Sequence, residues 1–210
     1  NSDSVLVGSC SLYDFTPKSI LDIGTGTGVI ALMLAQWYKE AEIYGIEIDR
    51  DAALLAKRNF NISKWKNRLH LIENDLKSFK PQIKFDFIVS NPPFFQNSLR
   101  SKKEFINRSK HNLSLSIEDI LSFSEKYLNQ KGRLNLILPI ERLKDIEELC
   151  SNSKLGLKEI IYIYPKYNSQ IKRIITSLEF GESNYIIESS LMIEKESRHD
   201  YHNLYKSLCK

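Results

Sequence analysis

A glycine-rich segment at residues 24–28, Gly-Thr-Gly-Thr-Gly, is the feature that most restricts how this chain can fold. It follows a short apolar run at residues 18–23, and the residues after it, up to Trp37, have apolar side chains at helical spacing. Glycine lacks a Cβ and tolerates positive φ, so such a loop lets the backbone approach a ligand closely. The pattern predicts a strand, a tight loop and a helix, the first unit of an α/β fold.

Strands and helices alternate along most of the remaining chain. A helix capped by Asp49 is predicted to end near residue 61, and a second, opened by a capping box at Ser116, to run to about residue 130 and end at Gly132. Further helices are predicted near residues 141–151 and 199–208. Strands are predicted at residues 18–23, 42–48, 69–73, 85–90, 133–138, 159–164, 172–180 and 185–194. We therefore expect one α/β domain over residues 1–210, with an open, mostly parallel sheet, helices on both faces and an antiparallel pair at the end.

Composition narrows the setting in which this domain works. No apolar run approaches the roughly 20 residues of a membrane helix, so we expect no membrane association. The three cysteines, Cys10, Cys150 and Cys209, are odd in number and far apart, which predicts a reducing cytoplasm rather than a disulfide framework. The chain opens at Asn1 without an initiator Met, so we expect residues upstream of it. We expect no obligate protein partner.

Charge and histidine content say little by themselves. The formal net charge of +4 permits contact with nucleic acid without requiring it. His199 and His202 stand at helical spacing, but no cluster of further ligands completes a metal site, so we expect no metal.

Carboxylates near the ends of the first two strands point to a ligand that carries a ribose. Asp22 directly precedes the glycines, and Glu47 lies about 20 residues beyond them, where a carboxylate can accept both hydroxyls of a ribose. A nicotinamide enzyme would carry the spacing Gly-x-Gly-x-x-Gly, whereas this chain has Gly-x-Gly-x-Gly. A further acidic site, Asn74-Asp75, follows the third strand, although capping of the next turn is an equally good interpretation of Asp75.

The loop after the fourth strand, Asn91-Pro92-Pro93-Phe94, is the most specific motif in the chain. The lone pair of an aromatic amino nitrogen is delocalised into its ring and must be localised before it can attack. The Asn91 side-chain oxygen and the Pro92 carbonyl can each accept one amino hydrogen, while Phe94 can stack on the base. The prolines stiffen the loop. An ordinary turn is the alternative, but its position after the fourth strand favours methylation of an amino group.

Together these motifs resemble the class I S-adenosylmethionine-dependent methyltransferases of the Asn-Pro-Pro-Phe/Tyr group, in particular the bacterial valine-tRNA adenine methyltransferases. The likeness spans nearly the whole chain, including residues 1–8, residues 132–139, Lys172-Arg173 and the Tyr-His-Asn-Leu-Tyr-Lys tail. It implies a Rossmann-like sheet of seven strands, with S-adenosylmethionine as cofactor and S-adenosylhomocysteine as product. It also implies a tRNA substrate, methylated on N6 of adenine-37 beside the anticodon. The implied cofactor-binding residues are Asp3, Asp22, Gly24, Thr25, Gly26, Gly28, Glu47, Asp75 and Asn91.

Two groups of basic residues are candidate contacts for RNA phosphates. Residues 100–110, which follow the Asn-Pro-Pro-Phe loop, carry five cations against one carboxylate, and Lys172-Arg173 forms a smaller patch. The cations of the longer segment are Arg100, Lys102, Lys103, Arg108 and Lys110. A solvated loop without a partner is an equally good interpretation of such a charge run.

Three other functions are compatible with the motifs. A glutamine amide of a release factor poses the same chemical problem as an adenine amino group, and adenine in ribosomal RNA or DNA poses an identical one. A non-catalytic module that binds RNA is the third, and the complete Asn-Pro-Pro-Phe motif disfavours it.

Overall fold

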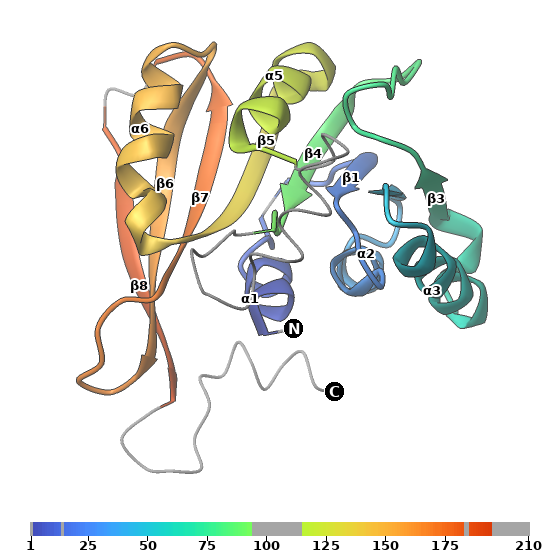
Figure 1. Cartoon of the computed structure of the whole chain (residues 1–210), viewed down its shortest axis with the longest axis horizontal. Helices are drawn as coiled ribbons and strands as arrows, with labels where there is room; N and C mark the ends of the chain where they lie inside the picture. Colours follow the sequence, from blue (N-terminus) through green and yellow to red (C-terminus); the bar gives the residue numbers. More distant parts are fainter. Residues whose placement is uncertain (1, 14, 94–114, 183–184, 195–210) are drawn as a thin grey trace, which may run out of the picture.

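The computed structural model describes residues 2–13, 15–93, 115–182 and 185–194, which form a sheet with helices on both sides (Figure 1). The predicted helix at residues 199–208 lies outside the described residues. In chain order the elements are α1 Ser2–Ser9, β1 Ser19–Ile23, α2 Val29–Trp37, β2 Glu42–Glu47, α3 Arg50–Ile62, η1 Lys66–Arg68, β3 Leu69–Glu73, β4 Phe85–Ser90, α5 Ile117–Tyr127, β5 Leu128–Pro139, η2 Ile140–Arg142, α6 Leu143–Ser151, β6 Leu155–Lys166, β7 Arg173–Phe180 and β8 Ile187–Glu194.

Within the described residues, eight strands form one sheet in the order β3-β2-β1-β4-β5-β7-β6-β8. Strands β1 to β5 pair in parallel, whereas β7 runs antiparallel to both β5 and β6, which confirms the predicted antiparallel pair. The family resemblance implied seven strands. The additional strand is β8, which pairs in parallel with β6 from Glu159 to Lys166. This pairing satisfies backbone groups that a long edge strand would otherwise leave open.

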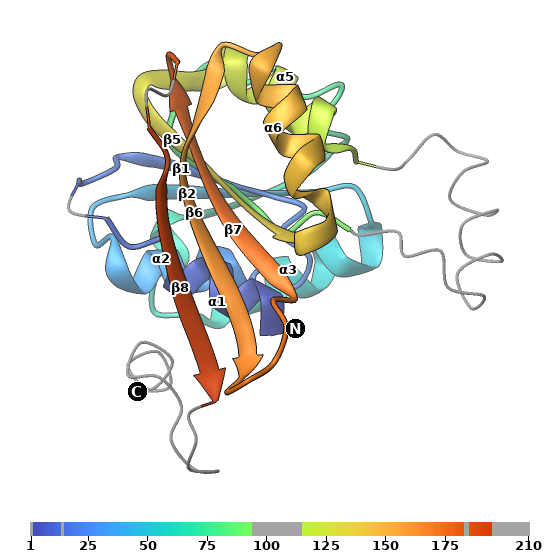
Figure 2. The ribbon, with the colours of Figure 1, turned by 90° about the vertical axis from the view of Figure 1, so that its left-hand side faces the viewer.

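Two apolar cores, one on each face of the sheet, account for the layers. On one face α5 and α6 bury Ile120 and Ile146, and on the other α2 and α3 bury Leu34 and Phe60 beside residues of α1. Successive residues of a strand point to opposite faces, so the neighbours Phe87 and Ile88 of β4 belong to different cores. Figure 2 shows the two groups of helices on opposite sides of the strands. The predicted cover on both faces is confirmed.

The boundary between α5 and β5 differs from its prediction. The capping box is present, because the Asp119 N–H donates to Ser116 Oγ at 3.1 Å. The helix ends at Tyr127, however, and Gly132 lies inside β5, so the prediction that this glycine ends the helix is wrong. Leu128 is fully buried and pairs with β4. Burial in the sheet therefore overrides the local helical pattern.

A buried hydrogen-bond network holds the segment after α1 on the sheet. Asn135 of β5 donates from Nδ2 to Ser11 Oγ at 3.0 Å, and its Oδ1 accepts from Ser177 of β7 at 3.0 Å and from the Tyr13 hydroxyl at 3.2 Å. Ser11 in turn donates to the carbonyl oxygen of Val7 in α1 at 2.6 Å. The carboxyl end of α1 is thereby fixed to β5 and β7.

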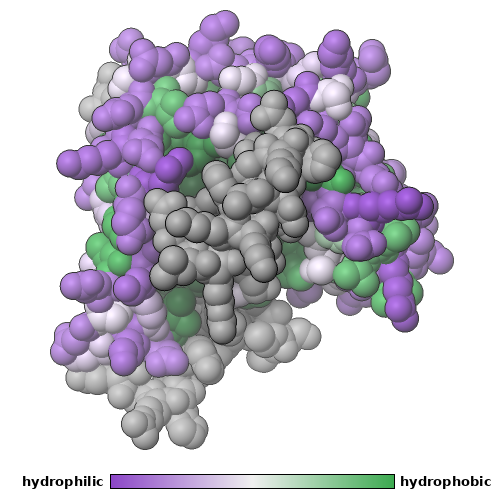
Figure 3. All heavy atoms as spheres, viewed as in Figure 1, coloured by the Kyte–Doolittle hydropathy of each residue, from purple (hydrophilic) through white to green (hydrophobic). Residues whose placement is uncertain are grey.

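The surface of the described residues is mostly polar. The face seen in Figure 3 is hydrophilic over most of its coloured area, with smaller apolar areas between. Within the four described ranges, no helix is both long and apolar enough to cross a membrane. The exposed apolar groups include Leu54 and Leu55, which occupy the outer side of α3.

Arg68, the last residue of η1, closes the carboxyl end of α2. Its guanidinium donates to the backbone carbonyl oxygens of Ala35 at 2.8 Å, Tyr38 at 2.9 Å and Ala41 at 2.7 Å. The last carbonyl groups of a helix have no partner within the helix, and a cation at that end is favourable. Because the glycine loop leads into the other end of α2, Arg68 stabilises the helix that this loop precedes.

Replacing Arg68→Ala removes the donor to all three carbonyl oxygens. We expect the free energy of unfolding to fall by about 2 to 3 kcal/mol, the typical contribution of hydrogen bonds to a charged group. Urea denaturation at pH 7 measures this change. The matched control is Arg58→Ala on the exposed side of α3, which should stay within about 0.5 kcal/mol of the unaltered protein. Equal losses in both variants would contradict the capping role.

Candidate active site

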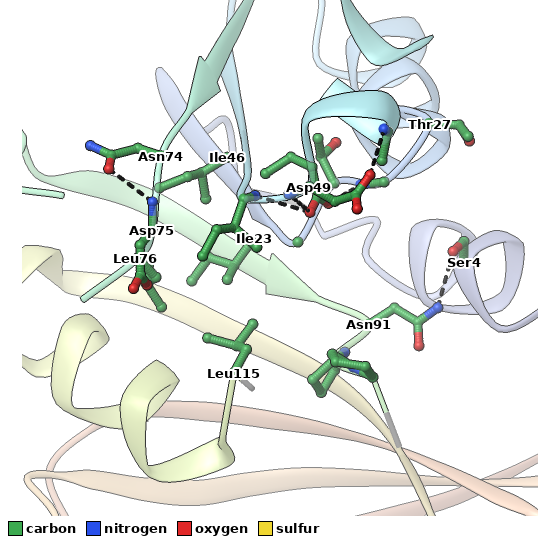
Figure 4. Close-up of a pocket in the computed structure, with 18 of the residues that line it drawn as sticks. Ser4, Ile23, Thr27, Ile46, Asp49, Asn74, Asp75, Leu76, Asn91 and Leu115 are labelled. Atoms are coloured by element: carbon green, nitrogen blue, oxygen red, sulfur yellow. Dashed lines mark hydrogen bonds between the residues drawn. The ribbon is translucent and has the colours of Figure 1, made fainter. Parts of the chain in front are cut away.

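A cavity of about 780 Å³ opens at the carboxyl ends of β1 to β4 (Figure 4). Small-molecule sites commonly measure about 300–1,000 Å³. The cavity lies where the strand order reverses, because β1 has β2 on one side and β4 on the other, and ligands of open α/β sheets bind at such a point. Of the predicted cofactor residues, those that line the cavity are Asp3, Gly24, Thr25, Gly26, Glu47, Asp75 and Asn91. Asp22 and Gly28 lie behind this lining.

The loop between β1 and α2 depends on backbone conformations that favour glycine. Gly24, Gly26 and Gly28 have φ angles of 67°, 57° and 85°. A Cβ on Gly28 would lie 2.5 Å from a ring carbon of Phe60, so this position also needs glycine for packing. A Cβ on Gly26 would meet nothing within 4 Å, which leaves the loop open toward the cavity.

Asp22 supports the loop from inside the core. Its side chain is fully buried, and Oδ2 accepts from Thr25 Oγ1 at 2.6 Å and from the Ala31 N–H at 3.2 Å. Burial raises the pKa of this carboxyl to about 7, although the hydrogen bonds from Thr25 and Ala31 oppose the rise. Among the described residues, Oδ1 has no hydrogen-bond partner. Asp22 therefore shapes the loop from behind and does not face the cavity.

Glu47 lies at the end of β2, and three backbone N–H groups already hold its carboxylate. Oε2 accepts from Gly26 at 2.8 Å, and Oε1 accepts from Ile48 and Asp49 at 3.0 Å each. A carboxylate has about four acceptor directions. One of them therefore remains for a ligand hydroxyl, so a second hydroxyl would have to share an oxygen with a backbone N–H.

Both interpretations of Asp75 have structural support. Its Oδ1 accepts from the Lys77 N–H at 3.0 Å, the hydrogen bond of a capped turn, while its own N–H donates to Asn74 Oδ1 at 2.8 Å. Asp75 also lines the cavity, and among the described residues its Oδ2 carries no hydrogen bond. One oxygen thus shapes the turn and the other is available to a ligand.

Asn91 follows β4 and brings a primary amide to the cavity. Its Nδ2 donates to Ser4 Oγ in α1 at 3.1 Å, and Figure 4 shows the amide oxygen directed away from Ser4. Pro92 is buried and Pro93 is exposed, and both line the cavity. Phe94, the predicted stacking residue, lies outside the described residues. Asn91 therefore presents an acceptor beside the cavity carboxylates.

Of the two predicted basic groups, the structure describes Lys172-Arg173 and not residues 100–110. Residues 100–110 lie outside the described residues, so that group stays a prediction. Arg173 donates from Nε to Asp3 Oδ2 at 2.9 Å, which joins β7 to α1 beside the cavity. Lys172 is exposed next to Arg173. The structure thus brings Asp3, predicted to contact the cofactor, against Arg173, predicted to contact RNA.

Several residues of the cavity were not predicted as site residues. Ser4 comes from α1, Arg50 and Lys77 add positive charge to the lining, and Leu115 closes one side with apolar surface. Asp49 was identified only as a cap, and its Oδ1 does accept from the Ala52 N–H at 2.9 Å. No sequence motif marks Ser4, because only the fold brings it to Asn91. Within the described residues, no group of three or more His, Cys, Asp or Glu could hold a metal ion.

Comparisons with known proteins agree on a family. Residues 5–149 match the model of the family described as methyltransferase small domain. The chain is 32% identical over 211 residues to the tRNA1(Val) (adenine(37)-N6)-methyltransferase of Christiangramia forsetii, which covers 99% of this chain and 87% of that protein. It is 34% identical to the protein of the same name from Parabacteroides distasonis, over 100% of this chain and 88% of that one.

Solved structures share the fold at low identity. A predicted O-methyltransferase from Agrobacterium tumefaciens has a TM-score of 0.75 at 19% identity, covering 98% of this chain and 94% of that one. The glycopeptide N-methyltransferase MtfA complexed with S-adenosylmethionine has a TM-score of 0.64 at 8% identity, covering 86% and 94%. These structures confirm the predicted fold class.

The buried carboxyl of Asp22 predicts a pH dependence of stability. Its pKa rises from the ordinary 3.8 to about 7 on folding, so between these values the folded protein holds a proton that the unfolded chain has released. The free energy of unfolding therefore falls as pH rises through this window. Asp22→Asn cannot titrate, and between pH 5 and pH 8 it should gain about 3 kcal/mol relative to the unaltered protein.

Urea denaturation of both proteins at the two pH values tests this expectation. Asp51→Asn, on the exposed side of α3, is the matched control and should follow the unaltered protein. If the stability of Asp22→Asn kept a constant offset from pH 5 to pH 8, the raised pKa would be wrong.

Proposed function

The chain belongs to the methyltransferase small domain family, and we propose that it methylates the exocyclic N6 amino group of an adenine in tRNA, adenine-37 beside the anticodon of valine tRNA. The observation that carries the proposal is the Asn91 amide, which lies in the lining of a cavity that also contains carboxylates. The names of relatives that share about a third of the sequence over its whole length support tRNA as substrate. The enzyme then works in the cytoplasm, where it meets that tRNA.

The cavity fits S-adenosylmethionine by charge and by shape. When bound, this cofactor supplies a methyl group on a positively charged sulfur and leaves as S-adenosylhomocysteine. Glu47 and Asp75 form no ion pair among the described residues, so their carboxylates favour a cationic ligand. Glu47 accepts a ribose hydroxyl, and Asp75 accepts from the adenine amino group through Oδ2. A Cβ on Gly26 would meet nothing within 4 Å, so the loop leaves room for the ligand beside it.

The residues after β4 hold and polarise the amino group of the substrate. Asn91 Oδ1 and the Pro92 carbonyl each accept one amino hydrogen, which localises the nitrogen lone pair away from the ring. As positive charge develops on that nitrogen, both acceptors bind it more strongly than in the flat ground state. Pro93 stiffens the loop, and Phe94 stacks on the base. After transfer the methylated nitrogen is cationic and strongly acidic, and it releases one hydrogen as a proton to water, so no strong base is required.

Two groups of basic residues supply the contacts to RNA. Lys172 is exposed beside the Asp3–Arg173 ion pair, so its ammonium group can reach a phosphate next to an inserted base. The cations of residues 100–110, which come soon after the Asn-Pro-Pro-Phe loop in the sequence, supply the second contact. A base in an RNA loop enters such a pocket with little unstacking, whereas a base in a duplex must first be flipped out.

The proposal predicts transfer of labelled methyl groups from S-adenosylmethionine to unmodified tRNA, recovered as N6-methyladenosine in valine tRNA. Asn91→Ala should lower the rate by about 100-fold or more while cofactor affinity stays within about threefold, because the amide oxygen acts on the amino group of the substrate. Rates come from single-turnover assays and affinities from calorimetry.

Asn61→Ala, an exposed position on α3 remote from the cavity, is the matched control and should keep the full rate. Label found only in ribosomal RNA or in a release factor would retain the chemistry and refute the substrate. An unchanged rate in Asn91→Ala would refute the amide mechanism.

If Lys172 contacts a phosphate, Lys172→Ala should weaken tRNA binding about equally for different tRNAs. The slope of the logarithm of affinity against the logarithm of salt concentration should also become shallower by about one. Filter binding between 50 and 200 mM salt measures both effects. Lys131→Ala is the matched control, since this exposed lysine lies near the amino end of β5, whereas Lys172 lies beside the carboxyl end of that strand. A slope unchanged in Lys172→Ala would contradict the contact.

A further inference from the structure

The amide of Asn91 has two ends of similar size and opposite polarity. A rotation of about 180° around the last side-chain bond exchanges its oxygen with its NH2 group. Under the proposed function only one orientation works, because an NH2 group turned toward an amino group would place donors against donors. The mechanism therefore requires the amide to be held with its NH2 group away from the substrate.

In the structure Ser4 contacts the NH2 end of this amide and leaves the oxygen end facing away (Figure 4). Its Oγ lies 3.1 Å from Asn91 Nδ2 and accepts a hydrogen bond from it, across 87 residues of sequence. Both residues line the cavity, and Figure 4 shows Asn91 with its nitrogen toward Ser4 and its oxygen turned away. We propose that Ser4 is a positioning residue that holds the Asn91 amide with its oxygen toward the amino group of the substrate. This inference rests on the proposed function.

The helix that carries Ser4 is itself held at both ends. Asp3, the preceding residue, is paired with Arg173 of β7. At the other end, Leu6 and Val7 are buried in the core, and Ser11 is bonded to Asn135. The helix thus presents the Ser4 hydroxyl at a fixed place, and the hydroxyl orders the Asn91 amide before any substrate arrives. A group placed in this way loses little freedom during the reaction.

Ser4→Ala tests the inference, because alanine favours the helix and removes only the hydroxyl. We expect kcat for unmodified tRNA to fall about tenfold, which corresponds to about 1.4 kcal/mol. The KM for tRNA and the affinity for S-adenosylmethionine should stay within about twofold. Ser4→Thr keeps a hydroxyl and should restore at least about half of the rate. Ser9→Ala, the same change in the same helix without a contact to Asn91, should keep the full rate.

A measurement without substrate separates this inference from the proposed function. The side-chain NH2 signals of Asn91 in a ¹⁵N–¹H spectrum are identified by their loss in Asn91→Asp. They should shift in Ser4→Ala and stay in place in Ser9→Ala. Failure of the unaltered protein to methylate any adenine would refute the proposed function, whereas the spectrum would still test the contact. The positioning role would be overturned by an active protein in which Ser4→Ala keeps the full kcat, or in which Ser4→Thr is as slow as Ser4→Ala.

Discussion

The buried carboxylate of Asp22 is the constraint on which the rest of the site depends. It holds Thr25 and the first turn of α2 through one oxygen, and this fixes the loop with its three glycines in the positive-φ region. The Gly26 N–H of that loop in turn donates to Glu47, so the loop after β1 is bonded to the end of β2 beside the cavity. Burying a carboxyl group is costly unless it is hydrogen-bonded or neutral. The pKa of Asp22 is raised to about 7 because burial disfavours its charged form.

A second constraint connects the site to the far half of the sheet. β7 lies beyond β5 in the strand order, yet Arg173 at its start is paired with Asp3 of α1, and Asn135 and Ser177 hold the segment that follows α1. Helix α1 therefore contacts both the start of β7 and the residue that follows β4. Its position gives the antiparallel part of the sheet a role beyond completing the core, because that part holds the helix whose Ser4 contacts Asn91.

The features that could be predicted from sequence are those encoded by neighbouring residues. The glycine loop and Asn91-Pro92-Pro93 each follow a strand directly, and Glu47 is the last residue of β2. Parallel strands bring their carboxyl ends together, so a common cavity followed from the order of motifs. The contacts Ser4–Asn91 and Asp3–Arg173 join residues 87 and 170 positions apart, and no local pattern encodes them. The start of β5 was missed for a related reason, since Leu128 continues the helical pattern of α5 but is buried against β4.

The two proposed acceptors limit how the rate of methyl transfer can respond to pH. Neither the Asn91 amide nor the Pro92 carbonyl titrates in the neutral range, so the proposed polarisation of the amino group brings no pKa of its own. Among the described residues that line or support the cavity, Asp22 is the group whose pKa burial moves to about 7. It touches the glycine loop and not the Asn91 side of the cavity. A change of pH near 7 should therefore alter cofactor affinity through the glycine loop. The rate of methyl transfer once cofactor and tRNA are bound should vary little, because the loop and the Asn91 amide follow different strands.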